Sequence, residues 1–515
     1  RGVKWKGEYH HAKVLLRHNK IIQNNKMENY EIVIGMEAHA ELLTQTKQFC
    51  SCANVALAPP NTNVCPVCLG FPGSLPVLNA KNVDLSLRSV LALNCDINQH
   101  NFFERKNYFY PDLPKAYQTT QAAAPLGVGG FLEIDVKDGK STFTKRVGIH
   151  DVHMEEDTGK STHGDAGGNA TGDPDSSLVD FNRAGIPLLE IVSLPDMRSV
   201  EEAEAYMNTL RQILLYLEIS DCKMEQGRLR FEASVSLRLP GAELGTRVEI
   251  KNLNSMKSVR DALRSEIARQ QKVLSSGGTV EQMTMLWDEA SGTTQPMRSK
   301  EHAHDYRYFP EPDLPPLHID TEWIERVRAA MPELPRLKKE RFINELGLTE
   351  YEASVLTADR EIADFYEAAL AGYDNPKVLS NWVSNELLGR LNAENQAISE
   401  SKVSPAQMRG LVKLIDAGTI SGKIAKEVFD DMLQTGRDAE VIVDEKGLTQ
   451  VSDTSELKAI CQTVIDKSDK IVQDYLGGKE KSFGALVGGV MKETKGRANP
   501  GLVNELLKEI LAGMK

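Results

Sequence analysis

The sequence lacks several features that would point directly to a function. No uninterrupted apolar run approaches the roughly 18 residues that a membrane-spanning helix needs. There is no Gly-rich phosphate loop, no Gly-x-Gly-x-x-Gly turn and no Gly-x-Ser-x-Gly elbow, so a nucleotide would have to be held by a metal ion and a sheet. Acids outnumber cations, 73 to 61, and the net charge of −12 argues against binding nucleic acid over the whole surface. We therefore expect no membrane or DNA partner, and only local contact with any RNA.

Cysteine is scarce and unevenly placed. The chain has seven cysteines, an odd number, and four of them fall between positions 50 and 68. Cys50 and Cys52 are separated by twelve residues from Cys65 and Cys68, a spacing at which four thiolates can close a tetrahedron around zinc. The alternative is a group of buried or reactive thiols. Because no ligand position would be left open for water, a zinc ion here would be structural.

The first part of the chain has the pattern of a β-rich domain. Among 515 residues, 41% are hydrophobic and 26% are charged, which is typical of a globular protein of roughly three domains. From Met27 to about Leu317, apolar and polar residues alternate in short segments that are separated by turn-forming residues. The alternation is unbroken over 229–239, whereas 199–218 and 259–275 have helical spacing. This region is therefore predicted to be α+β.

The spacing becomes helical after the proline-rich run 309–316, so we expect a domain boundary near that run. Ser404 followed by Pro405 is typical of a helix start. The stretch 477–515 is basic, with a glycine-rich segment and a turn at 495–500. It is either a solvated helix end or a loop that contacts an RNA backbone.

The first 26 residues do not fit the core. They carry seven Lys or Arg against a single acid and have no clear period. They are either an organellar-type presequence or translated upstream sequence outside the fold, and their low Ser and Arg content favours the second reading.

Acids and imidazoles gather on one side of the predicted strands. In the first strand, alternation places Glu37, His39 and Glu41 opposite the apolar residues. Carboxylates that share a cavity repel each other and need cations, and an oxygen-rich site with one imidazole suits Mg²⁺ together with substrate phosphates. Each acid alone could equally belong to an exposed strand face or a salt bridge. Glu190 is the exception, because it lies inside an apolar run and needs a partner. The other acids of this pattern are Glu155, Glu156 and Glu249.

Cations and aromatic rings are interleaved in the segment 105–118, which also holds two prolines. Such a segment can bind phosphates while its rings stack on a base or a sugar. A rigid structural loop is an equally good interpretation. The candidate binding residues of this segment are Arg105, Lys106, Tyr108 and Tyr110.

Six ordered motifs together resemble the B subunits of the aspartyl/glutamyl-tRNA(Asn/Gln) amidotransferases. They include Val-Ile-Gly-Met-Glu-Ala-His-Ala-Glu-Leu at 33–42, in the first strand, and His-Met-Glu-Glu-Asp-Thr-Gly-Lys-Ser-Thr-His at 153–163. The six motifs span 33–42, 105–118, 153–163, 178–193, 248–255 and 305–313. Nearly the whole chain from Met27 onward is covered by the resemblance.

The resemblance implies an α+β fold in three parts. A glutamine-synthetase-like cradle domain would span 27–317, with the zinc knuckle inside it, and 1–26 would lie outside the fold. A helical domain would follow at 318–402. An all-α tail of the YqeY type would span 403–515 and meet the body of a tRNA.

The resemblance also implies an activity, an ATP-dependent carbon–nitrogen ligase with glutamine as amido donor. It would phosphorylate the side-chain carboxylate of Glu-tRNA(Gln) or Asp-tRNA(Asn) and then amidate it with ammonia. The ammonia would come from an amidase-type glutaminase, the A subunit, and a small C subunit would complete a heterotrimer. The location would be the bacterial cytoplasm, or an organelle if the first 26 residues are a real presequence.

Site residues carry over motif by motif. His39, Glu156 and Glu190 would bind Mg²⁺, and the four clustered cysteines would bind structural zinc. Further catalytic candidates, for a second ion or for the ATP phosphates, are Glu37, Glu155 and Glu249. Besides those of the 105–118 segment, the candidate ATP or substrate contacts are Lys160, Arg183, Glu232 and Asn252.

One stretch departs from the family pattern. Where the family has Arg-Cys-Asp-Ala-Asn-Val-Ser, this chain has Arg-Phe-Glu-Ala-Ser-Val-Ser at 230–236. Glu232 and Ser234 therefore rank below the other site residues.

Two further functions fit the residues. One is a glutamine-synthetase-like ligase that acts on a free amino acid. The other is a non-catalytic tRNA-binding or assembly subunit, in which the acids would be structural.

Overall fold

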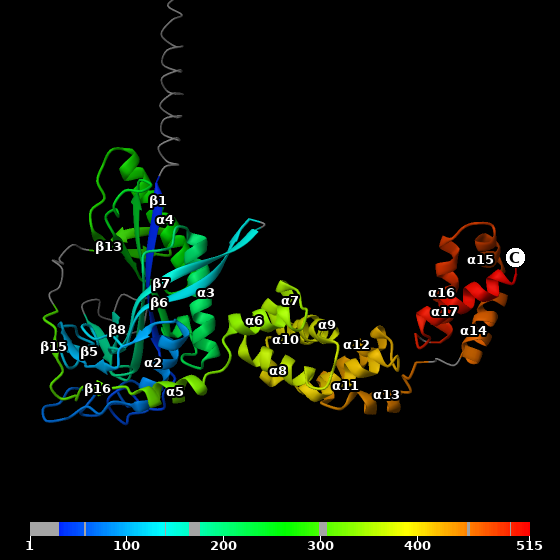
Figure 1. Cartoon of the computed structure of the whole chain (residues 1–515), viewed down its shortest axis with the longest axis horizontal. Coiled ribbons are helices and arrows are strands. Elements are labelled where there is room, and N and C mark those ends of the chain that lie inside the picture. The colour runs from blue at the N-terminus through cyan, green and yellow to red at the C-terminus, as the bar shows by residue number, and fades with distance from the viewer. Residues whose placement is uncertain are drawn as a thin grey trace, which may run out of the picture. The chain divides into compact units, whose positions relative to one another are not determined.

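The computed structural model describes residues 30–55, 58–139, 141–163, 176–297, 306–450, 454–494 and 496–514. Contacts divide the chain into two units, up to Leu334 and from Pro335 onward, and each is described separately (Figure 1). The predicted extension 1–26 lies outside the described residues. The domain limits expected at 317 and 402 remain predictions. None of the helices described is both long and apolar enough to cross a bilayer.

The first unit is built on a nine-stranded sheet in the order β14-β13-β12-β11-β1-β10-β7-β6-β2. Neighbouring strands pair antiparallel except β12 and β13, which are parallel. The alternation predicted at 229–239 is confirmed as β11. The strands are β1 Glu31–Glu41, β2 Asp96–Ile97, β6 Gly127–Asp138, β7 Ser141–Glu156, β10 Pro187–Ser193, β11 Leu229–Arg238, β12 Val248–Lys251, β13 Met283–Asp288 and β14 Thr293–Pro296.

Helices pack against the apolar side of this sheet. They are α2 (Ala80–Ala92), α3 (Val200–Tyr216) and α4 (Met256–Ser275), and the last two confirm the predicted helical segments. The side chains of Ser199 and Ser255 accept hydrogen bonds from backbone amides of the first turn and start α3 and α4.

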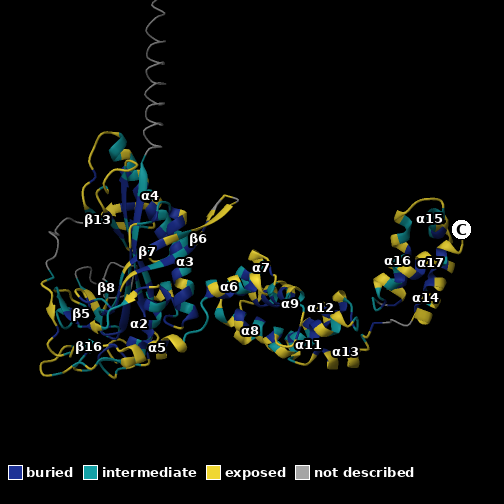
Figure 2. Ribbon diagram, in the orientation of Figure 1, coloured by how far each residue is buried: buried dark blue, intermediate teal, exposed yellow. Residues whose placement is uncertain are grey.

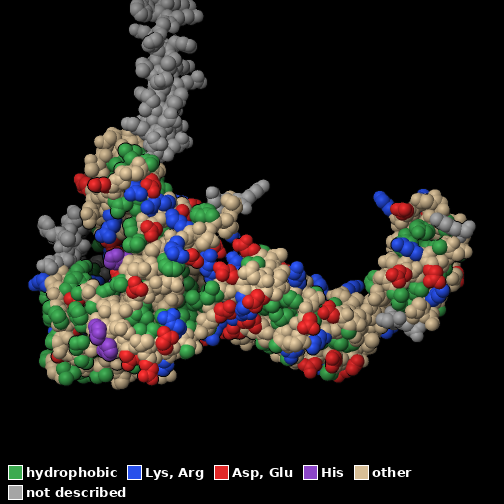
Figure 3. All heavy atoms as spheres, viewed as in Figure 1, with side chains coloured by type: hydrophobic (Ala, Val, Ile, Leu, Met, Phe, Trp, Pro, Cys, Tyr) green, Lys and Arg blue, Asp and Glu red, His purple; other side chains and the backbone are tan. Residues whose placement is uncertain are grey.

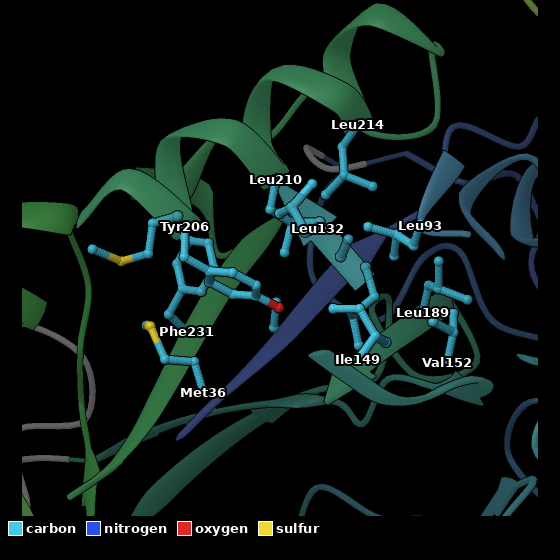
Figure 4. Packing of buried hydrophobic residues seen from close by; sticks show 14 of the residues in the cluster. Met36, Leu93, Leu132, Ile149, Val152, Leu189, Tyr206, Leu210, Leu214 and Phe231 are labelled. Atoms are coloured by element: carbon cyan, nitrogen blue, oxygen red, sulfur yellow. The ribbon is translucent and has the colours of Figure 1, made fainter. Parts of the chain in front are cut away.

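The core lies between α3 and the strands. Tyr206 and Leu210 of α3 pack with Met36 and Phe231 of the sheet (Figure 4). Buried residues are concentrated in the strands and in the helix faces that meet them (Figure 2). Burying each such side chain stabilises the fold by about 1.5–3 kcal/mol, so the apolar side of the sheet is covered by helices and forms the core. The polar residues of the same strands must therefore point to the other side.

Smaller elements border the large sheet. The segment 105–118 forms most of the hairpin of β4 (Glu104–Asn107) and β5 (Tyr117–Thr120), to which β15 (Phe309–Pro310) adds a third strand. The remaining elements of this unit are β3 His100–Asn101 with β16 Leu317–His318, β8 Lys160–His163 with β9 Ser177–Asp180, η1 Met224–Gln226 and α5 Thr321–Ala329.

The second unit is helical in its described residues, so the expected change of spacing is confirmed. One core extends from Phe342 to Val443 and another from Leu457 to Leu511. Ser404 caps α11 (Pro405–Asp416) in a capping box with Gln407, as the Ser-Pro pair predicts. Acidic and basic side chains are interspersed on the face in view (Figure 3).

The helices of this unit are α6 Pro335–Asn344, α7 Glu350–Leu356, α8 Arg360–Leu370, α9 Pro376–Asn381, η2 Trp382–Leu387 (a π-helix), α10 Leu388–Ala393, η3 Ile398–Glu400, α11 Pro405–Asp416, α12 Gly422–Thr435, α13 Ala439–Lys446, α14 Thr454–Asp466, α15 Asp469–Leu476, α16 Lys481–Glu493 and α17 Pro500–Ala512. The α+β class, sheet-rich first and helical afterwards, is therefore confirmed.

Candidate functional site

Strand register brings distant residues into one row on the polar side of the sheet. His39 of β1 pairs with Glu190 of β10, and Glu190 pairs with His153 of β7. Directly paired residues of antiparallel strands point to the same face, so the three side chains are neighbours. Oε2 of Glu190 lies 3.4 Å from Nε2 of His39 and 3.2 Å from Nε2 of His153. The partner that the sequence demanded for Glu190 is therefore a pair of imidazoles.

The two imidazoles control the ionisation of Glu190. Burial raises its pKa, but the hydrogen bonds to His153 and His39 outweigh burial and hold the pKa well below the ordinary value. Conversely, burial lowers the pKa of His153, yet its bonds to Asp151 and Glu190 raise that pKa to about 10. Glu190 is thus a carboxylate, and His153 an imidazolium, at neutral pH.

Glu155 completes a group that could hold a metal ion. One donor atom from each of His39, Glu155 and Glu190 lies within 4.8 Å of the other two. Lys106 Nζ is 3.2 Å from Oε1 of Glu155. Burial raises the pKa of Glu155, although Lys106 opposes the shift. Two carboxylates and one imidazole form a donor set that fits Mg²⁺.

Glu156, the ligand that the resemblance assigns, is placed differently. It follows Glu155 directly in β7, and successive side chains of a strand alternate between faces. Its Oε1 accepts a hydrogen bond from the backbone N of Thr119 at 2.8 Å and one from Lys115 Nζ. It lines a cavity of about 230 Å³ that Cys68 and Glu311 also line. The described donor group thus contains Glu155 and not Glu156. Mg²⁺ binding by Glu156, which the resemblance implies, stays a prediction, and binding by Glu155 is the alternative that this geometry favours.

Further acids extend the polar face from this row. Glu37 pairs with Glu232 across β1 and β11. Burial, followed by the charges of Glu190 and Glu232, raises the pKa of Glu37. Lys251 Nζ lies 3.3 Å from Oε2 of Glu232 and 3.1 Å from Oε1 of Glu249. Although burial alone would raise it, Lys251 keeps the pKa of Glu232 below the ordinary value. The side chain that departs from the family pattern is therefore an ion-paired carboxylate.

The residues predicted in the 105–118 segment have different surroundings. Arg105 binds Glu311 through two hydrogen bonds of 2.8 and 2.7 Å, which fasten β15 to β4. The Tyr108 hydroxyl donates to Gln118 within the hairpin. Tyr110 is exposed. Of the four residues predicted in this segment, only Lys106 makes a described ion pair with an acid of the group His39, Glu155 and Glu190, namely Glu155.

The remaining predicted contacts are scattered. Arg183 donates to the backbone oxygens of Thr158 and Gly159, and its Nε lies 3.7 Å from Oδ2 of Asp157. Lys160 is exposed on β8. Asn252 has a positive φ of 64° and donates to the backbone oxygen of Trp287, which is a structural contact.

Sequence reasoning missed three charged neighbours of the site. His153 lies two residues before Glu155, so its period-two spacing could have placed it on the same face. Asp157 and Arg230 have the same period-two spacing from Glu155 and Glu232, but their hydrogen bond of 3.0 Å depends on the arrangement of distant strands, which local spacing does not encode.

The four clustered cysteines converge as predicted. One Sγ atom from each lies within 4.8 Å of the other three, and all four are free of disulfides. The backbone N of Cys65 donates to Sγ of Cys68 at 3.1 Å. The hydrogen bond from Cys50 is the largest cause that lowers the pKa of the Cys68 thiol, to about 5. Four soft sulfur donors at this separation fit a tetrahedral zinc ion.

Comparison with known proteins gives matches along most of the chain. Residues 32–325 match the family model described as GatB/GatE catalytic domain, and residues 364–511 match the one described as GatB domain. A protein of Carboxydothermus hydrogenoformans, named as the B subunit of aspartyl/glutamyl-tRNA(Asn/Gln) amidotransferase, is 55% identical over 487 residues, which are 94% of this chain and 100% of the relative. Proteins of the same name are 54% identical in Thermoanaerobacter pseudethanolicus, over 94% of this chain and 99% of the relative, and 51% identical in a Geobacter species, over 94% and 100%.

Proposed function

This chain belongs to the family of aspartyl/glutamyl-tRNA(Asn/Gln) amidotransferase B subunits, and from that premise we propose that it activates and amidates the side-chain carboxylate of a misacylated tRNA. It is the ligase subunit of a glutamine-dependent complex. The observation that carries the proposal is the convergence of His39, Glu155 and Glu190 from three strands onto one polar face beside Lys106.

The chemistry explains why such a face is needed. A carboxylate resists attack by ammonia because oxide is a very poor leaving group. Transfer of the γ-phosphoryl group of ATP to a carboxylate oxygen yields ADP and an acyl phosphate. Attack of ammonia on its carbonyl carbon then breaks the carbon–oxygen bond, phosphate leaves, and nitrogen loses a proton. ATP and the reacting carboxylate are both anionic, so their approach requires positive charge.

The residues of the face divide this work. His39, Glu155 and Glu190 would hold Mg²⁺, which when bound supplies charge neutralisation for the phosphates. Lys106 is placed beside them to contact a phosphate or the acyl oxygen. Glu37, whose pKa burial raises, is a carboxylate that can accept the proton that nitrogen releases. An acyl phosphate hydrolyses readily, so the reaction requires that water be excluded while this intermediate exists.

The other components follow from the same assignment. Ammonia comes from an amidase-type A subunit, since the sequence has no glutaminase nucleophile motif, and a small C subunit completes the heterotrimer. The basic C-terminal stretch contacts the misacylated tRNA. The four cysteines hold a structural zinc ion. The complex works in the bacterial cytoplasm.

A reconstituted assay tests the proposal. Amide formation is measured with ATP, Mg²⁺ and the partner subunits, on Glu-tRNA(Gln), Asp-tRNA(Asn) and free glutamate. We expect activity on charged tRNA, and a loss of at least about a hundredfold in Glu190→Gln while glutaminase activity persists. The matched control is Glu201→Gln, an exposed acid of α3. Activity on free glutamate alone would instead favour an amino-acid ligase, and full activity of Glu190→Gln would favour a non-catalytic role.

A further inference from the structure

Lys47 is a buried cation in the segment that follows β1. Its side chain is 0% exposed. Its Nζ donates to the backbone oxygen of Asn63 at 3.0 Å and to that of Phe181 at 3.5 Å. No carboxylate forms an ion pair with it within the described ranges. A buried ammonium without a counter-charge would cost several kcal/mol of folding free energy, so this position needs an anion.

The neighbouring anion is sulfur. Nζ of Lys47 lies 3.8 Å from Sγ of Cys68, one of the four converging cysteines. A divalent ion bound by four thiolates has a formal charge of −2, and one buried ammonium would halve it. An N–H directed at a ligating sulfur also fixes the orientation of that ligand, which is how outer-shell partners commonly act on metal sites.

Lys47 also connects the cysteines to a turn of the active-site sheet. Phe181, whose oxygen it binds, lies in the turn 180–185, which leads into β10 and hence to Glu190. Other hydrogen bonds join the segment 47–68, which holds Lys47 and the four cysteines and is called the cysteine segment below, to the same turn. They are Asn61 N to Asp180 Oδ1 at 2.9 Å, Asn63 N to Asn182 Oδ1 at 2.8 Å and Gln48 N to Gly185 O at 2.9 Å.

We propose that Lys47 is the internal counter-charge of the metal-bound cysteine site and couples metal occupancy to the position of the turn before β10. Lys47 is a positioning residue, since it touches neither substrate nor reacting atoms. The inference rests on the zinc site proposed above, but it does not depend on the reaction. Without the metal, the ammonium loses most of its anionic partner, and the bond to Phe181 O is then its one remaining hydrogen bond to the turn among the described contacts.

Zinc affinity of the full-length chain tests the counter-charge. It is measured by chelator competition in wild type, Lys47→Gln, which can still donate to carbonyls, and Lys47→Met, which cannot. We expect both variants to bind zinc about 10- to 100-fold more weakly. The control is Lys145→Gln, which removes a half-buried cation elsewhere in the first unit, paired with Glu202, and should bind zinc like wild type.

The outcomes separate the two proposals. A wild type without tight zinc binding would overturn the zinc site itself. Tight binding in wild type with affinity within threefold in both Lys47 variants would overturn only the counter-charge, since a purely structural lysine destabilises the metal-loaded and metal-free chains equally.

Hydrogen exchange of the wild-type chain tests whether zinc occupancy is coupled to the turn, and this test does not require the variants to fold. Zinc is removed with a chelator and then restored. We expect amide exchange to rise reversibly both in 50–68 and in the turn 180–185. Faster exchange in the cysteine segment with an unchanged turn would overturn the proposal.

Discussion

The face of the sheet to which a side chain points decides which groups each acid of the sheet can contact. Glu155 and Glu156 are chain neighbours, yet one joins His39 and Glu190 and the other binds Lys115. Glu190 is charged because two imidazoles face it, and not because water reaches it. The chemistry of the site therefore depends on pairs of residues.

His153 provides a residue-scale prediction with a defined pH dependence. Its pKa is about 10 in the folded chain against an ordinary 6.5, so the folded state binds the extra proton between these values. The stabilisation is fully present below about pH 6.5 and is lost as the pH rises through about 10. His153→Gln should lower the free energy of unfolding of the metal-free chain by about 2 kcal/mol at pH 7.

Urea titrations of wild type and variant at pH 7 and above pH 10 check this prediction. The difference between the two proteins should shrink at the higher pH. If the difference in free energy of unfolding between wild type and His153→Gln is the same at both pH values, His153 stabilises the fold by packing and not by its charge.

At the scale of elements, hydrogen-bonded ion pairs fasten short strands to the site. β15 is two residues long and cannot hold its place by ladder bonds alone. The bidentate pair between Arg105 and Glu311 joins it to β4, next to Lys106. Arg105 therefore acts on the site indirectly, because its ion pair fixes β15 against β4, the strand that also carries Lys106.

Glu311→Gln tests this fastening. Burial raises the pKa of Glu311, but the bond to Arg105 outweighs it and keeps the pKa below the ordinary value. The carboxylate thus stabilises the fold above about pH 4.5, and this contribution is lost as the pH falls through the lower, folded-state value. We expect the variant to be about 2 kcal/mol less stable at pH 7 and to approach wild type in acid.

Equilibrium unfolding of both proteins between pH 3 and pH 7 gives the comparison. Arg146→Gln, which removes an exposed pair with Glu133, is the control and should change stability by less than about 1 kcal/mol. Equal stability of Glu311→Gln and wild type at pH 7 would argue against the fastening.

The elements differ in how far the sequence predicts them. The alternation in β1 and β11 and the helix cap at Ser404 follow from local spacing, and both are confirmed. The row of His39, Glu190 and His153 depends on register between strands that are distant in the sequence, and no local pattern encodes register. For the same reason the sequence could not distinguish Glu155 from Glu156. The cysteine cluster was predictable because its four donors are close in sequence.

At the scale of the whole molecule, the chain consists of two units with separate cores. Separate cores favour separate unfolding transitions. We expect calorimetry to resolve at least two transitions, of which zinc removal shifts only the one that belongs to the first unit.

Leu411→Ala identifies the other transition. Leu411 is fully buried in the helical core, and its truncation should cost about 3 kcal/mol there without changing zinc binding. A single transition that responds to both zinc removal and Leu411→Ala would mean that the chain unfolds as one body.

The proposed chemistry requires that His39, Glu155 and Glu190 form one ion-binding group on the polar face of the sheet. Titration with Mn²⁺ as a paramagnetic stand-in for Mg²⁺, followed by electron paramagnetic resonance, tests it most directly. Comparing Glu155→Gln with its chain neighbour Glu156→Gln supplies an internal control. We expect Mn²⁺ to bind at least about tenfold more weakly to Glu155→Gln and with nearly unchanged affinity to Glu156→Gln. The reverse order of the two variants, or unchanged binding in both, would contradict it.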